Sequence, residues 1–434
     1  MNALEQLFAE KRTENGDKAY KTTGNNLLDI LFMTAYYEKH LNEVHIGKSE
    51  KEQIFSMFIR DPRFGLGRRD LGRELMRLSD VESKNVVLAG RYDDLWHDPS
   101  NNNLQVLHDE IVNGNELAKK WAPRLNSKSK NVARILCSLW GLTEKQYRKL
   151  IKCNTTESKL SQHRTEEIEF EHVPSLAMIK YYKRFLTGED TKYRFTKYLE
   201  SVKKGETKLN ISTTNVYDIY KNREKIDADL FFDKLEKIKI SCIPILDTSG
   251  SMWDSNDSIG KATSIAHYLS KCSTYCNNQV LSFSSEPQLI TIHESDGAGI
   301  YYHNFGNKNK YSRELNSMYT GDCSNTDFGK VMKILKELKE FPEYLVVLSD
   351  MEFDYGSRQS KLELQKIWKE NNCNTKIVWW NFNDRNTTTP EVDSEGNIFI
   401  SGYNPTLLKY LEAGFDGNKF IDKLLEEYKK NIGM

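Results

Sequence analysis

The sequence predicts two domains of different class, an all-α half followed by an α/β half. Over residues 1–235, apolar residues recur three and four positions apart, which is typical of amphipathic helices. Over residues 236–434, short apolar runs alternate with amphipathic stretches, as in parallel sheets whose strands are covered by helices. A chain of 434 residues is long enough to form a separate hydrophobic core in each half.

The first half is expected to be a helical-repeat array. Helical spacing is visible in the stretches NNLLDILFMTAYY, EKEQIFSMFIRDP, RRDLGRELMRL and SKNVARILCSLWG, and further helices are expected over 175–187 and 191–203. In LTEKQYRKLIK, Thr143 and Gln146 have the spacing of a capping box at a helix start. Short helices with brief connections favour a stacked, HEAT-like array over a single closed bundle.

The second half is expected to be a doubly wound, Rossmann-like domain. Five apolar runs predict strands: IKISCIPIL, VLSF, YLVVLSD, KIVWWNF and NIFISG. Between them, SIAHYLSKCSTYC, FGKVMKILKELKE and LELQKIWKEN have helical spacing. Pro244 lies inside the first of these strands, where proline removes an N–H from the ladder, so we expect a locally unpaired position or a bulge there.

Charge and cysteine content restrict the class of protein. The formal net charge is zero, but residues 1–240 hold 42 Lys and Arg against 36 Asp and Glu, and the remainder holds 20 against 26. The basic half therefore suits an anionic partner. The seven cysteines include no CxxC pair, which favours free thiols in a reducing cytosol. Because no apolar run approaches the roughly 18 residues of a membrane span, we expect a cytoplasmic protein without membrane contact.

Oxygen-bearing side chains follow two of the expected strands. In PILDTSGSM, Asp247, Ser249 and Ser251 come directly after the first strand, and Asp350 ends YLVVLSD. Thr326 lies between them in the loop CSNTDFGK. The carboxyl ends of parallel strands meet at the ligand-binding edge of such sheets, and hard oxygen ligands suit Mg²⁺ (or Mn²⁺). A D-x-S-x-S stretch alone is often a turn that caps the next helix, but the later Thr and Asp, in this order, favour a metal site.

A strongly basic segment covers residues 119–152, in which Glu144 is the one acidic residue. Its cations, all candidate RNA-binding residues, are Lys119, Lys120, Arg124, Lys128, Lys130, Arg134, Lys145, Arg148, Lys149 and Lys152. The last four recur at helical spacing and form a stripe, opposite Tyr147, Leu150 and Ile151. A charged stripe is usually a solvated helix face, but such faces mix both signs. A stripe almost without acids favours contact with phosphates.

A second group of arginines, in FIRDPRFGLGRRDLGRELMR, alternates with acidic residues. Ion pairs within the protein are therefore the expected use of this group. Its glycines follow no expected strand and precede no Gly-Lys-Ser/Thr, so they do not predict a phosphate-binding loop.

The helical stretches RDPRFGLGRRDLGRELM, KWAPR, YRKLI and VPSLAM, followed by the DxSxS, Thr and Asp set, resemble the Ro autoantigen family. That family joins a TROVE module to a von Willebrand factor A (vWA) domain. The chain more closely resembles an uncharacterised family with the same layout in plants and large viruses. The resemblance covers about residues 50–420 and implies a TROVE-like domain over 1–235 and a vWA domain over 236–434.

The resemblance also implies how the sites work. Asp247, Ser249, Ser251, Thr326 and Asp350 would form a metal-ion-dependent adhesion site (MIDAS), with the hydroxyl groups bound directly and the two Asp bound through water. Such a site holds an acidic group of a partner and does not catalyse a reaction. The helical repeats would bind single-stranded RNA ends or small structured non-coding RNA in a ribonucleoprotein.

Two classes of function remain open. The first is a Ro-like RNA-binding protein, which the acid-poor segment favours. The second is a protein-binding adaptor, because helical repeats commonly bind peptides and vWA sites hold acidic groups. An enzyme is not expected, since the sequence contains no HExxH, Walker A or GxSxG motif and no cluster of carboxylates for two metals.

Overall fold

The protein divides into two compact units. The computed structural model describes residues 25–32, 34–89, 91–97, 99, 101–211, 213–254, 256–276, 278–283, 286–295, 309–319, 330–331, 334–335, 337–338, 341–350, 374–382, 391–392, 398–401, 403, 408–409, 411 and 417–434. The described residues of Tyr37–Thr213 and Ile421–Met434 form the helical unit, and those of Met1–Tyr36 and Thr214–Phe420 form the α/β unit. This division does not follow the expected boundary between residues 235 and 236. Helices just before that boundary group with the sheet, and the C-terminal segment groups with the N-terminal helices.

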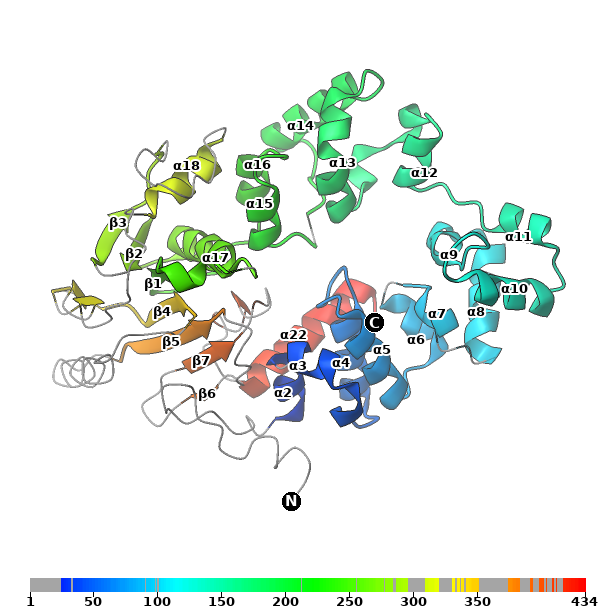
Figure 1. Ribbon diagram of the computed structural model, residues 1–434, viewed down its shortest axis with the longest axis horizontal. Helices are drawn as coiled ribbons and strands as arrows, with labels where there is room; N and C mark the ends of the chain where they lie inside the picture. Colours follow the sequence, from blue (N-terminus) through cyan, green and yellow to red (C-terminus); the bar gives the residue numbers. More distant parts are fainter. Residues whose placement is uncertain are drawn as a thin grey trace. The chain divides into compact units, whose positions relative to one another are not determined.

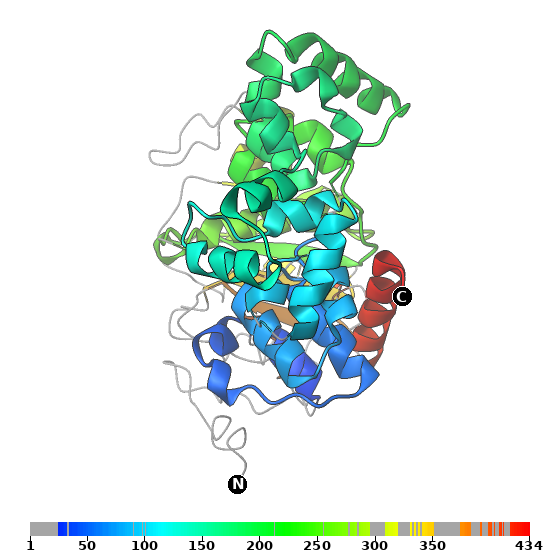
Figure 2. The same ribbon diagram turned by 90° about the vertical axis from the view of Figure 1, so that its right-hand side faces the viewer.

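The helical unit is built from short helices that pack against their neighbours in sequence. They are α4 (Glu50–Arg60), α5 (Arg69–Leu78), α6 (Ser83–Leu88), α7 (Asp94–His97), α8 (Asn101–Val112), α9 (Glu116–Trp121), α10 (Lys130–Leu139), α11 (Glu144–Leu150), α12 (Thr156–Ser161), α13 (Ser175–Thr187) and α14 (Lys192–Lys204), with α3 (Thr34–Lys39) and α22 (Gly417–Ile432) at the limits of the unit. Contacts join α4 to α5, α7 to α8 and α13 to α14 (Figures 1 and 2). The helices expected over 175–187 and 191–203 are confirmed within one residue.

Local sequence explains where several of these helices begin. The side chain of Ser49 caps α4 by accepting a hydrogen bond from the backbone N–H of Glu52, and the carboxylate of Glu52 accepts one from the backbone N–H of Ser49. Thr143 and Gln146 form the same reciprocal pair at the start of α11, as the sequence predicts. Such caps satisfy backbone groups that a helix leaves unpaired at its start. None of the helices in the described part of the chain has the length and apolar composition needed to cross a bilayer.

A buried ion-pair network joins α4, α5 and α7. The guanidinium of Arg60 is 1% exposed and lies 2.9 Å from Asp94, whose side chain is 2% exposed. Arg73 donates to the same carboxylate at 2.6 Å and to Asp93 at 2.9 Å. Most arginines of this region thus pair with acidic residues of the protein, as expected: Arg60, Arg63, Arg68, Arg73 and Arg77. Each buried charge is compensated by an opposite one, so removal of one partner leaves the other desolvated and unpaired.

We expect Asp94→Asn to lower the free energy of unfolding of the helical unit by about 3–5 kcal/mol, because Arg60 stays buried with its main counter-charge removed. Asp422→Ala is the matched control, since Asp422 pairs with Lys51 on the surface of the same unit. An exposed pair contributes about 1 kcal/mol or less. Denaturant unfolding followed by circular dichroism measures both variants. Equal losses would contradict a structural role for the buried network.

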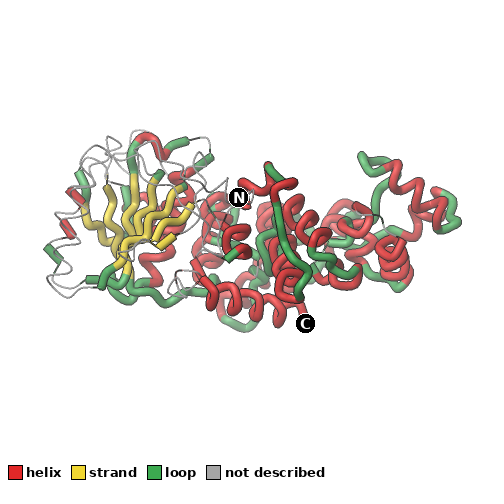
Figure 3. The backbone as a smooth tube through the Cα atoms, turned by 90° about the horizontal axis from the view of Figure 1, so that it is seen from below, coloured by secondary structure: helices red, strands yellow, loops and turns green. Residues whose placement is uncertain are grey.

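The α/β unit contains a sheet that is mostly parallel. Its strands are β1 (Cys242–Asp247), β2 (Gln279–Phe283), β3 (Gln288–Thr291), β4 (Tyr344–Ser349), β5 (Lys376–Asn381), β6 (Glu391–Val392) and β7 (Ile398–Ser401). In the described chain they lie in the order β3-β2-β1-β4-β5-β7-β6, side by side in Figure 3. The five inner strands are parallel and are the five that the sequence predicts. The edge strands β3 and β6 pair antiparallel and were not expected.

Both faces of the sheet are covered. Alternate residues of the strands, among them Ile245 and Val347, pack with Val331 and Leu335 of the helical segment that follows residue 329. Helix α17 (Ser258–Cys272) contacts β1, β2 and β4 but contributes no residue to that cluster, so it lies on the opposite face. Strand order runs outward from β1 toward β2 and from β4 toward β5. The reversal between β1 and β4 is the switch point at which such sheets bind ligands.

Helices outside the sheet complete the unit. They are α2 (Asn26–Phe32), α15 (Val216–Asn222), α16 (Ala228–Asp233) and α18 (Lys310–Ser317). Contacts of α15 with α17, and of α16 with α18, explain why residues 214–235 belong with the sheet. Between α17 and α18, Glu314 accepts hydrogen bonds from His267 at 2.7 Å and Lys271 at 2.9 Å. Burial alone would raise the pKa of Glu314, but these two partners outweigh it and lower the pKa to about 2.

Pro244 is accommodated in β1 without a bulge. It lies in register with Val346 of β4, whereas pairing with β2 starts only at Ile245. On the β2 side, the carbonyl of Cys242 instead accepts a hydrogen bond from the hydroxyl of Ser273 at 2.6 Å. The missing N–H of proline therefore falls where β1 has no ladder partner from β2, which agrees with a locally unpaired position.

Candidate functional site

Two acidic residues lie together at the carboxyl edge of the sheet. Strands β1 and β4 are parallel neighbours in which Leu246 is paired with Leu348. Asp247 is the last residue of β1, and Asp350 directly follows the last residue of β4. Both are buried, with exposed fractions of 0% and 5%. The pairing register alone thus brings side chains about a hundred positions apart in the sequence to one point.

Hydroxyl groups surround the carboxylate of Asp247. Its Oδ1 accepts a hydrogen bond from the backbone N–H of Ser249 at 2.9 Å, and its Oδ2 accepts one from the hydroxyl of Ser349 at 2.5 Å. The hydroxyl oxygens of Ser249 and Ser251 are 3.2 Å apart. Ser249 is buried and Ser251 is exposed. The loop after β1 therefore carries a chain of oxygen atoms from the buried carboxylate to the surface.

The electrostatics of this edge suit a cation. Burial raises the pKa of Asp247 to about 7, and the nearby charge of Asp350 adds to this, while hydrogen bonds from Ser349 and Ser249 act in the opposite direction. Two buried carboxylates at one point repel each other unless a proton or a cation lies between them. The donor atoms are all oxygen, which fits Mg²⁺ or Mn²⁺ and not a soft metal.

Two sequence predictions near this edge fall on residues that the structure does not describe. Thr326, the expected third hydroxyl ligand, lies outside the described residues, as does the helix expected in LELQKIWKEN. Within the described chain, no group of three or more His, Cys, Asp and Glu side chains is placed so that it could hold a metal ion. A cation at this edge would therefore take most of its ligands from hydroxyls and water. Ser349 was not identified from the sequence, although its place beside Asp350 at a strand end could have indicated it.

The basic segment 119–152 divides into paired and unpaired cations. Lys119 pairs with Glu116, and Lys120 pairs with Glu157. Arg134 and Arg148 both pair with Glu144. The remaining lysines of the segment are exposed and have no ion-pair partner in the described chain; we call them the basic face: Lys128, Lys130, Lys145, Lys149 and Lys152.

Arg124 has a structural role that the sequence did not reveal. Its guanidinium donates to the carbonyl groups of Lys119 at 3.0 Å and Lys120 at 3.2 Å, which end α9. It also donates to the carbonyl of Ile151, just beyond α11, at 3.2 Å. Arginine commonly satisfies the last carbonyls of a helix in this way. Arg124 thus fixes the end of α9 to the end of α11.

The stripe on α11 is exposed as expected. Tyr147 is fully buried, and its hydroxyl donates to the carbonyl of Pro123 at 2.9 Å. Ile151 is 2% exposed on the same side. Helix α11 ends at Leu150, so Lys152 projects from the segment beyond the helix and not from its last turn. The inward face of α11 therefore holds the helix in place, and the lysines on the outward face are not needed for packing.

Comparison with known proteins gives two family matches, each of which covers less than half of the chain. Residues 241–431 match a domain of unknown function (DUF7788), and residues 115–237 match another (DUF2828). The chain is 23% identical over 518 residues to the uncharacterized protein L728 of Acanthamoeba polyphaga mimivirus, an alignment that spans 96% of this chain and 88% of the viral protein. The viral relative agrees with the expected resemblance to a family found in large viruses.

Among solved structures, the chain is similar to the crystal structure of the Ro (RSR) protein of Deinococcus radiodurans. The superposition covers 96% of this chain and 99% of the other, with a TM-score of 0.46 and 11% sequence identity. The Ro protein carries the name of the family that the sequence resembles.

We expect Arg124→Ala to lower the free energy of unfolding of the helical unit by about 1–3 kcal/mol, because the carbonyls it bonds lose a charged donor. Lys128→Ala is the control, since it removes one positive charge from the same segment without removing a hydrogen bond. Such a surface change stays within about 0.5 kcal/mol. Urea midpoints of the two variants measure the difference, and an unchanged midpoint for Arg124→Ala would contradict the role given to Arg124.

Proposed function

We propose that this chain is an RNA-binding protein without catalytic activity. The basic face of the helical unit would hold the sugar–phosphate backbone of single-stranded or small structured non-coding RNA. The observation that carries the proposal is the set of five exposed lysines on and around α10 and α11 that lack an ion-pair partner in the described chain. Phosphates would supply the missing negative charge.

Several of these lysines lie where positive charge is unfavourable for the fold. Lys145 and Lys149 are four positions apart on α11, where like charges repel by a few tenths of a kcal/mol. Lys130 begins α10, and Lys145 lies in the first turn of α11. Positive charge near a helix start is unfavourable because the helix dipole is positive there. A surface that costs stability in these two ways is better explained by an external anion than by folding.

The same proposal includes the domain type of each of the two units. We take the helical unit to be a TROVE-like repeat array and the α/β unit to be a vWA domain. Support comes from the position of the DxSxS stretch after the central strand β1, with a second Asp after its neighbour β4. Support for the array comes from short helices that contact their neighbours in sequence.

The α/β unit would bind one Mg²⁺ or Mn²⁺ at the carboxyl edge of the sheet. Ser249 and Ser251 would bind the ion directly, and Asp247 and Asp350 would bind it directly or through water. The resemblance to vWA domains implies Thr326 as a further ligand. Such an ion would hold an acidic group of a partner. The exposure of Ser251 at the end of the hydroxyl chain favours that use, so an adaptor for an acidic protein group is the second candidate function.

Asp247→Ala should abolish measurable binding of Mg²⁺ or Mn²⁺, because hydroxyls without the buried carboxylate do not hold a hard dication. Asn256→Ala is the control, since Asn256 is exposed in the loop that follows the same site. Calorimetric titration of the metal into both variants and the wild type measures the affinities. If Asp247→Ala binds the metal as tightly as the wild type does, the metal assignment is wrong.

Replacement of Lys128, Lys130, Lys145 and Lys149 by Ala should weaken binding of every single-stranded RNA alike. It should also flatten the dependence of log affinity on log salt by up to about 3 units, since each phosphate contact contributes about 0.7. Filter binding at several salt concentrations gives both quantities. The matched control removes four exposed lysines from α13 and α14 of the same unit: Lys180, Lys183, Lys192 and Lys197.

The control should keep most of the affinity and the slope of the wild type. Equal losses in the two variants would mean that net charge, and not the basic face, determines binding. Unchanged affinity in the first variant, with its circular dichroism preserved, would make these lysines a solvated surface.

A further inference from the structure

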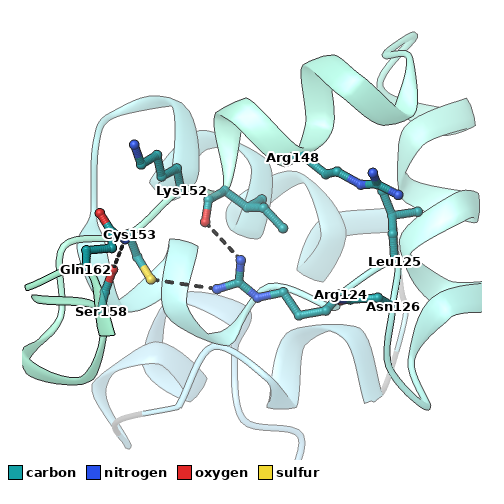
Figure 4. Close-up of a pocket in the computed structure, with 9 residues that line it drawn as sticks. Arg124, Leu125, Asn126, Arg148, Lys152, Cys153, Ser158 and Gln162 are labelled. Atoms are coloured by element: carbon teal, nitrogen blue, oxygen red, sulfur yellow. Dashed lines mark hydrogen bonds between the residues drawn. The ribbon is translucent and has the colours of Figure 1, made fainter. Parts of the chain in front are cut away.

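The helical unit contains a hollow of about 440 Å³ beside the basic face (Figure 4). The chain lines it from the end of α9 through α11 to α12. Its lining residues are Arg124, Leu125, Asn126, Arg148, Ile151, Lys152, Cys153, Ser158 and Gln162. The volume is in the range of small-ligand sites and is enough for about one nucleotide.

Positive charge converges on this hollow. Arg124, Arg148 and Lys152 line it, and none of the lining residues is acidic. Arg124 is held in place by its bonds to backbone carbonyls, and its Nη2 also lies 3.7 Å from the sulfur of Cys153. The salt bridge of Arg148 with Glu144 is long, at 3.5 Å, and exposed to solvent, so it is weak. Lys152 has no ion-pair partner in the described chain.

Neutral groups complete the lining. Gln162 donates a hydrogen bond to the hydroxyl of Ser158 at 2.8 Å. The hydroxyl hydrogen of Ser158 and the amide oxygen of Gln162 have no hydrogen-bond partner in the described chain. Asn126 adds a second amide on the opposite side of the hollow in Figure 4. Leu125 and Ile151 supply apolar surface. The hollow therefore combines strong anion donors with amides that can bond the edge of a base.

We propose that this hollow binds the terminal nucleotide of an RNA through its phosphate monoester, an inference that rests on the proposed RNA binding. A monoester carries close to two negative charges at neutral pH, whereas an internal phosphodiester carries one. Three cations around one small volume match the doubly charged group better than a single internal phosphate. The hollow admits about one nucleotide, so it suits the end of a chain better than a continuous strand.

The test uses one RNA sequence in three forms, with a 5′-phosphate, with a 3′-phosphate, or with hydroxyl groups at both ends. The wild-type protein should bind one phosphorylated form at least about tenfold more tightly than the hydroxyl form, because charge-assisted hydrogen bonds form only with the former. The preferred form identifies the end that is recognised. In the double variant Arg148→Ala and Lys152→Ala, the ratio of affinities should fall to about one.

The control variant is Lys145→Ala with Lys149→Ala, which removes two charges from the same helix outside the hollow. It should weaken binding of all three RNAs equally and keep their ratio. Bound RNA of the preferred form should also slow alkylation of Cys153, which lines the hollow, whereas the other described cysteines are buried. Circular dichroism checks that each variant is folded.

The outcomes separate this inference from the proposed function. If no form of the RNA binds the wild type, both fail. If all three forms bind with one affinity, RNA binding stands and the hollow is not a site for a chain end. If AMP alone binds as tightly as the preferred RNA, the hollow is a site for free nucleotides and the assignment to RNA is wrong.

Discussion

The cost of leaving a charge without a counter-charge is the constraint that orders this protein. Arg60 and Asp94 meet it fully, since both are buried and each lies within hydrogen-bond distance of the other. Glu314 meets it through His267 and Lys271. Charges of this kind hold helices together, and removal of one partner is costly. An external ligand is expected where the protein's own residues do not supply the opposite charge.

Two such places stand out in the described chain, one in each unit. At the carboxyl edge of the sheet, burial and the charge of Asp350 raise the pKa of Asp247 to about 7, so this edge favours a cation. On the basic face, the lysines lack an anion. The first site is buried and negatively charged, and the second is exposed and positively charged. The buried one suits a small hard metal ion, and the exposed one suits a flexible polyanion such as RNA.

Sequence periodicity predicted the elements that bury apolar runs, and it did not predict the elements set by long-range pairing. The inner strands were expected because each is a nearly continuous apolar run. Strand β3, with the sequence QLIT, is mostly exposed and depends on its antiparallel pairing with β2. The grouping of α15 with the sheet depends on its contact with α17, which no local pattern contains. Asp247 and Asp350 were predictable as a pair because the ends of neighbouring parallel strands must meet.

The basic segment shows the same limit at the level of single side chains. The sequence does not distinguish these cations, whereas the structure separates Arg124, whose guanidinium bonds three carbonyls, from lysines whose ammonium groups have no partner in the described chain. The central claim is that the unpaired lysines hold RNA. The most direct test is to purify the full chain gently at low salt and measure its absorbance ratio at 260 and 280 nm. We expect copurified nucleic acid that RNase removes, DNase spares and high salt releases. A protein free of nucleic acid under these conditions would contradict it.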